Sequence, residues 1–313
     1  RGPAIPSSNA YCVTVIQDGQ RHESFVYRIE AQETRDWRHN VCSFTTFSFS
    51  GPVVVEVTRL HNVWINSCRV YPSSYGITPE IVGSGTVRFV LARPMKKMAV
   101  IFNGDWTTHP LLIFADPLET NVPQPGDADV IYFRPGIHFA GLIRPRPSQT
   151  VYLAGGAYVK GAILAQNTSH VTVRGRGILS QEEMAFHEAC AVDLAGNSQG
   201  CLVEGITLIQ TASYAVRSYG WGSHIRNLKV VGAWRFNTDG VNAPPGGVVE
   251  DCFLKCDDDA IKLNWGTSVV RRNVIWQMEN GAVYQISWNM DQDGHGLHVY
   301  DDDVIRTEHR WDN

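Results

Sequence analysis

Short apolar runs separated by turn residues dominate the first 118 residues of the chain. Apolar and polar positions alternate within these runs, as they do in half-buried β-strands, and Gly, Pro, Asn and Asp gather between them. The runs that we expect to form strands are Tyr11–Ile16, Ser24–Ile29, Ser43–Phe49, Val53–Val57, Thr86–Leu91, Met98–Phe102 and Leu111–Ala115. Strands of this number and spacing predict a two-sheet β-sandwich over residues 1–118.

The next segment is predicted to be a linker between two domains. Residues 119–127 contain Pro123 and Pro125 and end in Gly126-Asp127. Such residues favour turns and interrupt regular strands. We therefore place the linker at residues 119–127 and a second domain at residues 128–313.

The second domain carries a repeat of a little over 20 residues. The similar runs are Val203–Leu208, Ile225–Val230, Val249–Leu254 and Val270–Ile275, which begin 22, 24 and 21 residues apart. Short strands at this period, with turns and no helical pattern between them, predict a solenoid. A right-handed parallel β-helix with three short strands per coil fits best, because each coil can bury its inward face only against its neighbours. The predicted fold class is therefore all-β.

Two acidic segments lie about one repeat apart. Asp239 precedes Asp258 by 19 residues and Asp259 by 20 residues. Stacked coils lie about 4.8 Å apart, so these three carboxyl groups are expected to meet, provided that a bulge or turn overrides strand alternation at Asp258 and Asp259. Crowding raises the pKa of at least one carboxyl group, and a protonated carboxyl beside an ionised one suits glycoside hydrolysis. The alternative is a solvated acidic turn, but the third acid and the nearby Lys262 favour a catalytic cluster.

These motifs resemble those of a known enzyme family. The sequence Asn237-Thr238-Asp239-Gly240, followed one coil later by Asp258-Asp259-Ala260-Ile261-Lys262, resembles glycoside hydrolase family 49, the dextranases and isopullulanases. It is more distantly similar to the family 28 polygalacturonases. The segments 175–182 and 280–285 support the resemblance. The resemblance implies a β-sandwich before a β-helix and endo-acting, inverting hydrolysis of a dextran- or pullulan-like α-glucan. It also implies Asp258 as the general acid, with Asp239 or Asp259 as the base.

Several residues near the acids are candidates for binding the polysaccharide. Amides, aromatic rings and an ammonium group can contact sugar hydroxyls and ring faces. The candidates are Asn237, Lys262, Trp265, Tyr284, Gln285 and Trp288. We expect neither a metal site nor a cofactor, and we interpret Asp301–Asp303 as a solvated turn.

Three other functions remain open. A hydrolase of an acidic polysaccharide would need a cationic subsite, for which Arg235, Lys255 and Lys262 are the nearby candidates. A calcium-dependent lyase would use the acids to bind metal and an Arg or Lys as base. A glycan-binding β-helix would lack catalysis altogether.

Composition narrows the class of protein and of partner. The net charge is −4 and no basic stripe occurs, which argues against a nucleic-acid partner. No apolar run approaches the roughly 20 residues of a membrane helix. We expect a secreted protein, because a polysaccharide is too large to import, and we expect a monomer. The resemblance to family 49 implies further coils beyond Asn313. The 7 cysteines lack metal-site spacing, and Cys42 and Cys68 could pair across the sandwich.

Overall fold

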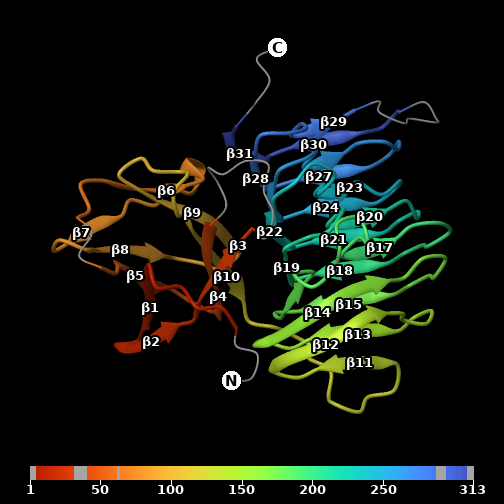
Figure 1. Ribbon diagram of the computed structural model, residues 1–313, viewed down its shortest axis with the longest axis horizontal. Coiled ribbons are helices and arrows are strands. Elements are labelled where there is room, and N and C mark those ends of the chain that lie inside the picture. Colours follow the sequence, from red (N-terminus) through yellow and green to blue (C-terminus); the bar gives the residue numbers. More distant parts are fainter. Residues whose placement is uncertain (1–4, 32–40, 62–63, 287–293, 309–313) are drawn as a thin grey trace. The chain divides into compact units, whose positions relative to one another are not determined.

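The computed structural model describes residues 5–31, 41–61, 64–286 and 294–308. The described residues form β-strands, turns and one short 3-10 helix, η1 (Ser73–Tyr75). The chain divides into two compact units, Arg1–Thr120 and Asn121–Asn313 (Figure 1). Among the described residues, no helix has the length and apolar character needed to cross a membrane.

The first unit is a β-sandwich of two five-stranded sheets. One sheet contains, in spatial order, β2 (Gln20–Ser24), β1 (Tyr11–Gln17), β5 (Val53–Arg59), β8 (Thr86–Leu91) and β7 (Glu80–Val82). The other contains β3 (Val26–Glu30), β4 (Val41–Phe49), β10 (Leu111–Pro117), β9 (Lys96–Phe102) and β6 (Cys68–Tyr71). Alternate side chains of both sheets, including Val13, Val55, Met98 and Ile113, form one buried core. The predicted sandwich is confirmed.

Three details of this unit differ from the sequence prediction. The short strands β6 and β7 were not predicted, and the expected strand Ser24–Ile29 is divided between β2 and β3. A bridge between Cys42 and Cys68 is wrong, because none of the 7 cysteines forms a disulfide. The strands β10 and β9 lie between β4 and β6, so three strand spacings, roughly 14 Å, separate the two residues. A disulfide tolerates a Cα–Cα distance of about 7 Å at most.

The second unit is a parallel β-helix, as predicted, with three columns of stacked strands. The first column contains β11 (Val130–Phe133), β13 (Thr150–Leu153), β15 (Thr172–Gly175), β18 (Leu202–Glu204), β21 (His224–Arg226), β24 (Val248–Glu250), β27 (Val269–Arg271) and β30 (His298–Tyr300). The second contains β12 (Gly136–Ile143), β14 (Ala157–Leu164), β16 (Ile178–Ser180), β19 (Thr207–Ile209), β22 (Lys229–Ala233), β25 (Phe253–Cys256), β28 (Val274–Gln277) and β31 (Asp303–Thr307). The third contains β17 (Val192–Leu194), β20 (Val216–Ser218), β23 (Val241–Asn242), β26 (Ile261–Lys262) and β29 (Tyr284–Gln285), and it joins the second column through β14.

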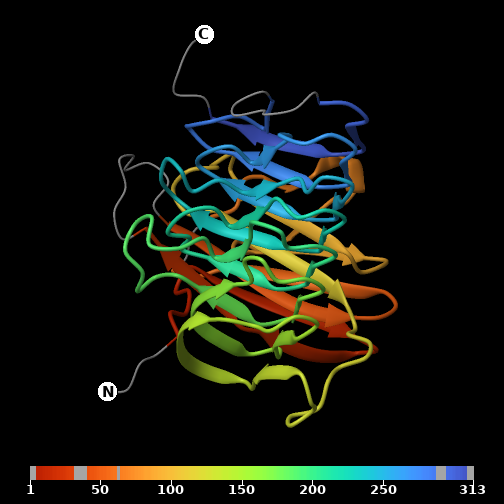
Figure 2. The ribbon, with the colours of Figure 1, turned by 90° about the vertical axis from the view of Figure 1, so that its right-hand side faces the viewer.

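The predicted repeat corresponds to successive coils of this stack. Val203, Ile225, Val249 and Val270 are register partners on neighbouring strands of the first column. All four side chains are fully buried in one aliphatic core. Figure 2 shows the coils of this unit stacked from yellow-green to blue along the sequence.

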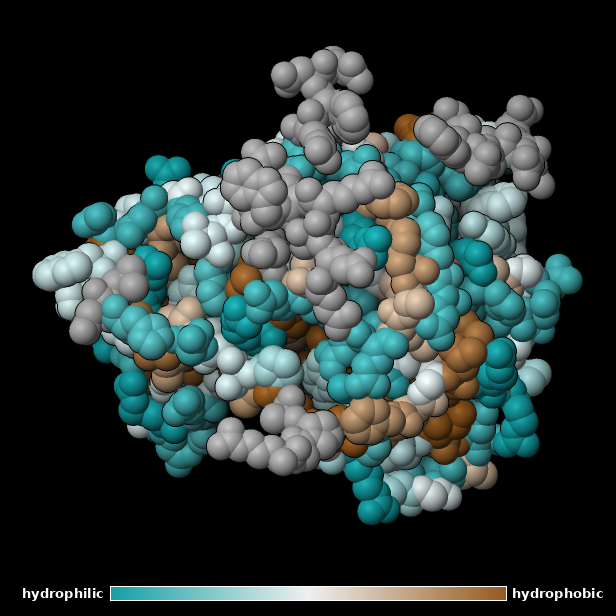
Figure 3. Space-filling view, in the orientation of Figure 1, coloured by the Kyte–Doolittle hydropathy of each residue, from teal (hydrophilic) through white to brown (hydrophobic). Residues whose placement is uncertain are grey.

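Much of the molecular face in Figure 3 is hydrophilic (teal), with hydrophobic residues (brown) in smaller groups.

Candidate active site

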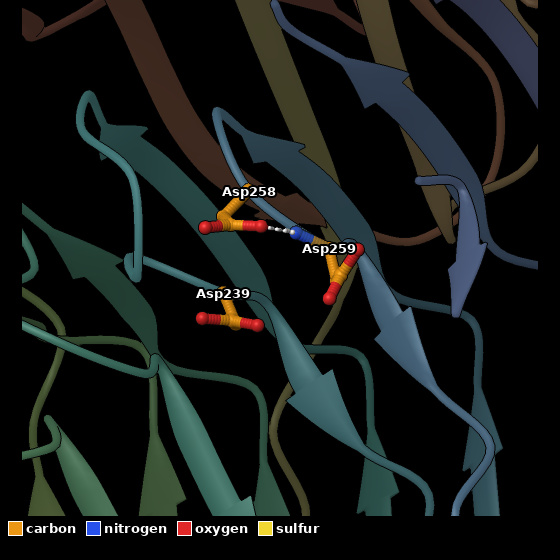
Figure 4. A group of neighbouring side chains, drawn as sticks. All are labelled: Asp239, Asp258 and Asp259. Atoms are coloured by element: carbon orange, nitrogen blue, oxygen red, sulfur yellow. Dashed lines mark hydrogen bonds between the residues drawn. The ribbon is translucent and has the colours of Figure 1, made fainter. Parts of the chain in front are cut away.

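The three acids lie in turns that lead into neighbouring strands of the third column. Asp239 lies two residues before Val241 of β23, and Asp259 lies two residues before Ile261 of β26. Val241 and Ile261 are register partners, so Asp239 and Asp259 occupy equivalent positions one coil apart. One oxygen from each of Asp239, Asp258 and Asp259 lies within 4.8 Å of the others (Figure 4).

Local hydrogen bonds fix the Asp258 carboxylate within this cluster. Residues 257–260 form bends and irregular backbone instead of a strand, so alternation does not separate Asp258 from Asp259. The Oδ1 atom of Asp258 accepts a hydrogen bond from the backbone N–H of Asp259 (2.9 Å). Its Oδ2 atom accepts from the backbone N–H of Asn237 (2.6 Å) and from Nδ2 of Asn280 (2.9 Å). Donors from three coil segments therefore hold this side chain in place.

Two glycines allow the coils to approach each other around the acids. A Cβ atom at Gly240 would lie 2.2 Å from the carbonyl oxygen of Ala260. A Cβ atom at Gly281 would lie 2.4 Å from the Asp259 nitrogen and 2.6 Å from Oδ1 of Asp258, and the φ angle of Gly281 is +73°. Larger side chains at these positions would displace the next coil, so glycine is part of how the cluster is built.

Lys262 binds two members of the cluster. Its Nζ atom lies 2.8 Å from Oδ2 of Asp239 and 2.7 Å from Oδ2 of Asp259. Burial alone would lower the pKa of Lys262, but its hydrogen bonds to Asp239 and Asp259 raise this pKa above its ordinary value. The other Asp259 oxygen accepts a hydrogen bond from the backbone N–H of Ala282 (2.9 Å). The ammonium group thus balances part of the negative charge and is already engaged by protein carboxylates.

Asp239 is the most deeply buried of the three acids, with 2% of its surface exposed. Burial raises the pKa of Asp239 to about 7; the hydrogen bond from Lys262 opposes this rise, and the charges of Asp258 and Asp259 add to it. The adjacent Asp257 also has its pKa raised by burial, to about 6. Asp239 within the cluster therefore exchanges its proton near neutral pH, which is a property suited to acid–base catalysis.

We expect the stability of the protein to depend on pH through Asp239. Its pKa is about 7 in the folded protein, against 3.8 for the free side chain. The folded state therefore binds this proton more tightly than the unfolded state does. Proton binding at Asp239 stabilises the folded state fully below pH 4, and this stabilisation is lost as the pH rises to about 7. The Asp239→Asn variant should become more stable than the wild type over this range, by on the order of a few kcal/mol at pH 8. Urea unfolding of both proteins at pH 4, 6 and 8 measures the difference in their free energies of unfolding. A difference that stays constant with pH would contradict the prediction.

A pocket opens beside the acids. Its volume is about 750 Å³, within the usual range of roughly 300–1,000 Å³ for sites that bind small molecules. Its lining combines carboxylates, amides and aromatic rings. The lining residues are Tyr214, Tyr219, Phe236, Asn237, Asp258, Asp259, Lys262, Asn264, Trp265, Asn280, Gly281 and Gln285.

Four of the six residues proposed to bind substrate line this pocket, namely Asn237, Lys262, Trp265 and Gln285. Tyr284 does not, contrary to the expectation from the sequence. Tyr284 is the register partner of Ile261 and packs against the aliphatic core of the coil, since strand alternation turns it inward when Gln285 faces the pocket. Trp288 lies outside the described residues.

The acidic run near the end of the chain is not simply a solvated turn. Asp302 is half-buried and accepts hydrogen bonds from the backbone N–H of Asn273 (2.7 Å), from Asn273 Nδ2 (3.0 Å) and from the Tyr284 hydroxyl (2.7 Å). Burial raises the pKa of Asp302 above its ordinary value. Asp302 therefore joins two coils, away from the pocket lining.

Six pocket residues were not among the candidates identified from the sequence, namely Tyr214, Tyr219, Phe236, Asn264, Asn280 and Gly281. Tyr214 could have been found by extending the acid column back by one coil. It lies two residues before Val216, which is the register partner of Val241, and its ring centroid is 5.4 Å from Nζ of Lys262. The other five lie in turns, bends or at strand ends, where the repeat gives no register.

Comparison with known proteins identifies relatives of one enzymatic type. No protein-family model matches the chain. A dextranase from Arthrobacter globiformis is 25% identical over 359 residues, covering 86% of this chain and 56% of the relative. An isopullulanase from Aspergillus niger is 28% identical over 308 residues, covering 79% of this chain and 54% of the relative. The chain therefore spans about half the length of these relatives.

A solved structure shares the fold. Dex49A from Penicillium minioluteum superposes with a TM-score of 0.75 at 21% sequence identity, covering 94% of this chain and 70% of that protein. At this identity the match supports the architecture of a β-sandwich followed by a β-helix.

Proposed function

We propose that the chain is a member of glycoside hydrolase family 49, because it is similar to a dextranase and an isopullulanase and shares its fold with Dex49A. We further propose that it is an endo-acting hydrolase of a neutral α-glucan such as dextran or pullulan. The observation that supports this most directly is the meeting of Asp239, Asp258 and Asp259 beside a pocket of about 750 Å³. Paired carboxyl groups are the usual catalytic groups of glycosidases.

In the proposed reaction Asp258 gives a proton to the leaving glycosidic oxygen, and a second carboxylate activates water. Asp258 and Asp259 both line the pocket, whereas Asp239 does not, which favours Asp259 as the base that contacts water. Asp239 and Lys262 then act as positioning residues, because Lys262 binds both Asp239 and Asp259. The role of each residue is assigned from family resemblance together with its access to the pocket.

Inversion at the anomeric carbon is part of the proposal and rests on the family resemblance. The closest oxygens of the three acids lie within 4.8 Å, whereas the two carboxyl groups of most inverting enzymes are about 6.5–9.5 Å apart. The spacing of the acids therefore does not support inversion by itself, and the product must be examined directly.

The pocket gives less support to an acidic substrate. Among the described residues that line it, Lys262 is the single Lys or Arg, and two carboxylates already bind its ammonium group. A calcium-dependent lyase is also less well supported, because the Lys262 ammonium contacts two of the three acids that would bind the metal. Nevertheless, both alternatives predict products that can be distinguished experimentally.

The test is product analysis on dextran, pullulan and polygalacturonate, with and without a chelator. We expect shorter, saturated oligosaccharides from one of the glucans, with activity unchanged by the chelator. Proton NMR within minutes of mixing should show the inverted anomer first. Unsaturated products that absorb in the ultraviolet would instead identify a lyase. Products that retain the anomeric configuration would contradict a single-displacement mechanism. If no glucan were cleaved, the proposed function would be overturned.

Location and assembly follow from the proposed substrate. A polysaccharide is cleaved where the enzyme can reach it, so we propose that the protein acts outside the cell. We also propose that it acts as a monomer, because the residues assigned to catalysis all come from one chain.

A further inference from the structure

One wall of the pocket holds buried polar atoms with no hydrogen-bond partner in the protein. These atoms are Oδ1 of Asn264, Nε1 of Trp265 and Oε1 of Gln285. The side chains of Asn264 and Gln285 are each only 8% exposed. The large majority of buried side-chain polar atoms in native structures have a hydrogen-bond partner in the protein or in ordered water. Three unsatisfied atoms on one pocket wall therefore indicate a position for a hydroxyl-rich ligand.

The coil register places these groups beside the acids. Ile261 and Leu263 belong to the aliphatic core, whereas Lys262 and Asn264 line the pocket, as strand alternation requires. Two residues span about 6–7 Å along an extended chain, so Asn264 lies roughly one sugar ring beyond Lys262. Gln285 is the register partner of Lys262 on the next coil. The two amide oxygens thus lie on adjacent coils, next to the proposed cleavage position.

An aromatic surface completes this wall. The rings of Trp265 and Tyr219 lie with their centroids 5.9 Å apart at an interplanar angle of 56°, and both residues line the pocket. The tilted rings form an apolar corner against which a sugar face can pack. The wall therefore offers two acceptors, one N–H donor and an apolar surface, without a free cation among the residues that line it.

We propose that Asn264, Trp265 and Gln285 form a subsite that binds the sugar next to the cleaved bond through uncharged hydroxyl groups. This inference rests on the proposed function, because the subsite would set the substrate specificity of the same pocket. Oδ1 of Asn264 and Oε1 of Gln285 accept hydrogen bonds from sugar hydroxyls, and Nε1 of Trp265 donates to a sugar oxygen. A uronic acid here would set its carboxylate against two acceptor oxygens and the neighbouring aspartates, so the subsite selects neutral sugars.

The test measures binding separately from hydrolysis. The probe is isomaltotriose, titrated by calorimetry into the full chain carrying Asp258→Asn, so that the probe is not cleaved. In this background Gln285→Met and Asn264→Leu remove the acceptors while keeping similar side-chain volumes. Each should weaken binding roughly 10- to 100-fold, because a sugar hydroxyl is left without its acceptor. Gln199, exposed in an irregular segment outside the pocket lining, gives the control Gln199→Met, which should bind as the parent does.

A panel of monodeoxy isomaltotrioses makes the test specific. The deoxy sugar that lacks the hydroxyl bound by Gln285 should bind the parent more weakly than isomaltotriose does. It should bind the parent and the Gln285→Met variant with equal affinity. Melting temperatures of the variants establish that they are folded. Parent-like binding of isomaltotriose by both folded variants, or binding of trigalacturonate as tight as that of isomaltotriose, would overturn the subsite. If the wild-type protein hydrolysed no glucan but the variants still showed these differences in binding, the proposed catalytic function alone would be overturned.

Discussion

The Asp258→Asn variant is expected to cleave the glucan at least about 10²–10⁴ times more slowly than the wild type while remaining folded. Asparagine keeps the shape of the side chain but cannot supply the proton for the leaving oxygen. Substrates with good leaving groups should lose less activity, because they depend less on protonation. Initial rates of reducing-end formation measure the effect, and full activity in this variant would remove Asp258 from the mechanism.

The same substitution should also reduce stability, for a reason visible in the hydrogen bonds of Asp258. Its two oxygens accept from Asn237, Asn280 and Asp259, and the NH₂ group of an asparagine must face at least one of these donors. The cost is about 1–3 kcal/mol. Asp302→Asn is a matched control, because Asp302 also accepts three hydrogen bonds but does not line the pocket. It should show a similar loss of stability with little loss of activity.

The architecture was predictable because its pattern repeats. Inward residues such as Val203, Ile225 and Val249 recur at nearly constant intervals, and each coil needs the next to cover its core. The short strands β6 and β7 of the sandwich were missed. β7 comprises only three residues, all exposed, so it has no inward apolar positions to reveal it.

The acids were predictable from spacing, whereas the rest of the site depends on local backbone. The 20-residue interval places Asp239 and Asp259 in one column. Whether Asp258 joins them depends on the bend at residues 257–260, which composition does not encode. Tyr284 was misplaced because the third column has strands of only two residues at β23, β26 and β29. Such strands are too short to show from alternation which side chain faces the core.

Replacing Lys262 by Met is expected to destabilise the protein by about 3–5 kcal/mol at pH 8 and to lower activity by roughly 10²–10³-fold. Two buried carboxylates, Asp239 and Asp259, would lose the cation that they share. The activity falls because Asp259 loses a hydrogen bond from Lys262 (2.7 Å) that positions it. Urea unfolding and initial rates on the same glucan measure the two effects.

The pH dependence of the Lys262→Met variant distinguishes loss of a charge partner from a general packing defect. The hydrogen bond from Lys262 opposes the raised pKa of Asp239, so its removal lets this pKa rise further above 7. At pH 5 the Asp239 carboxyl is then neutral, and the destabilisation should be clearly smaller than at pH 8. Lys160→Met is the control, because Lys160 also pairs with two carboxylates, those of Glu182 and Glu183, but closer to the solvent. The Lys160→Met substitution should destabilise the protein by about 1 kcal/mol or less. If Lys262→Met destabilised the protein equally at both pH values, Lys262 would stabilise it through packing alone.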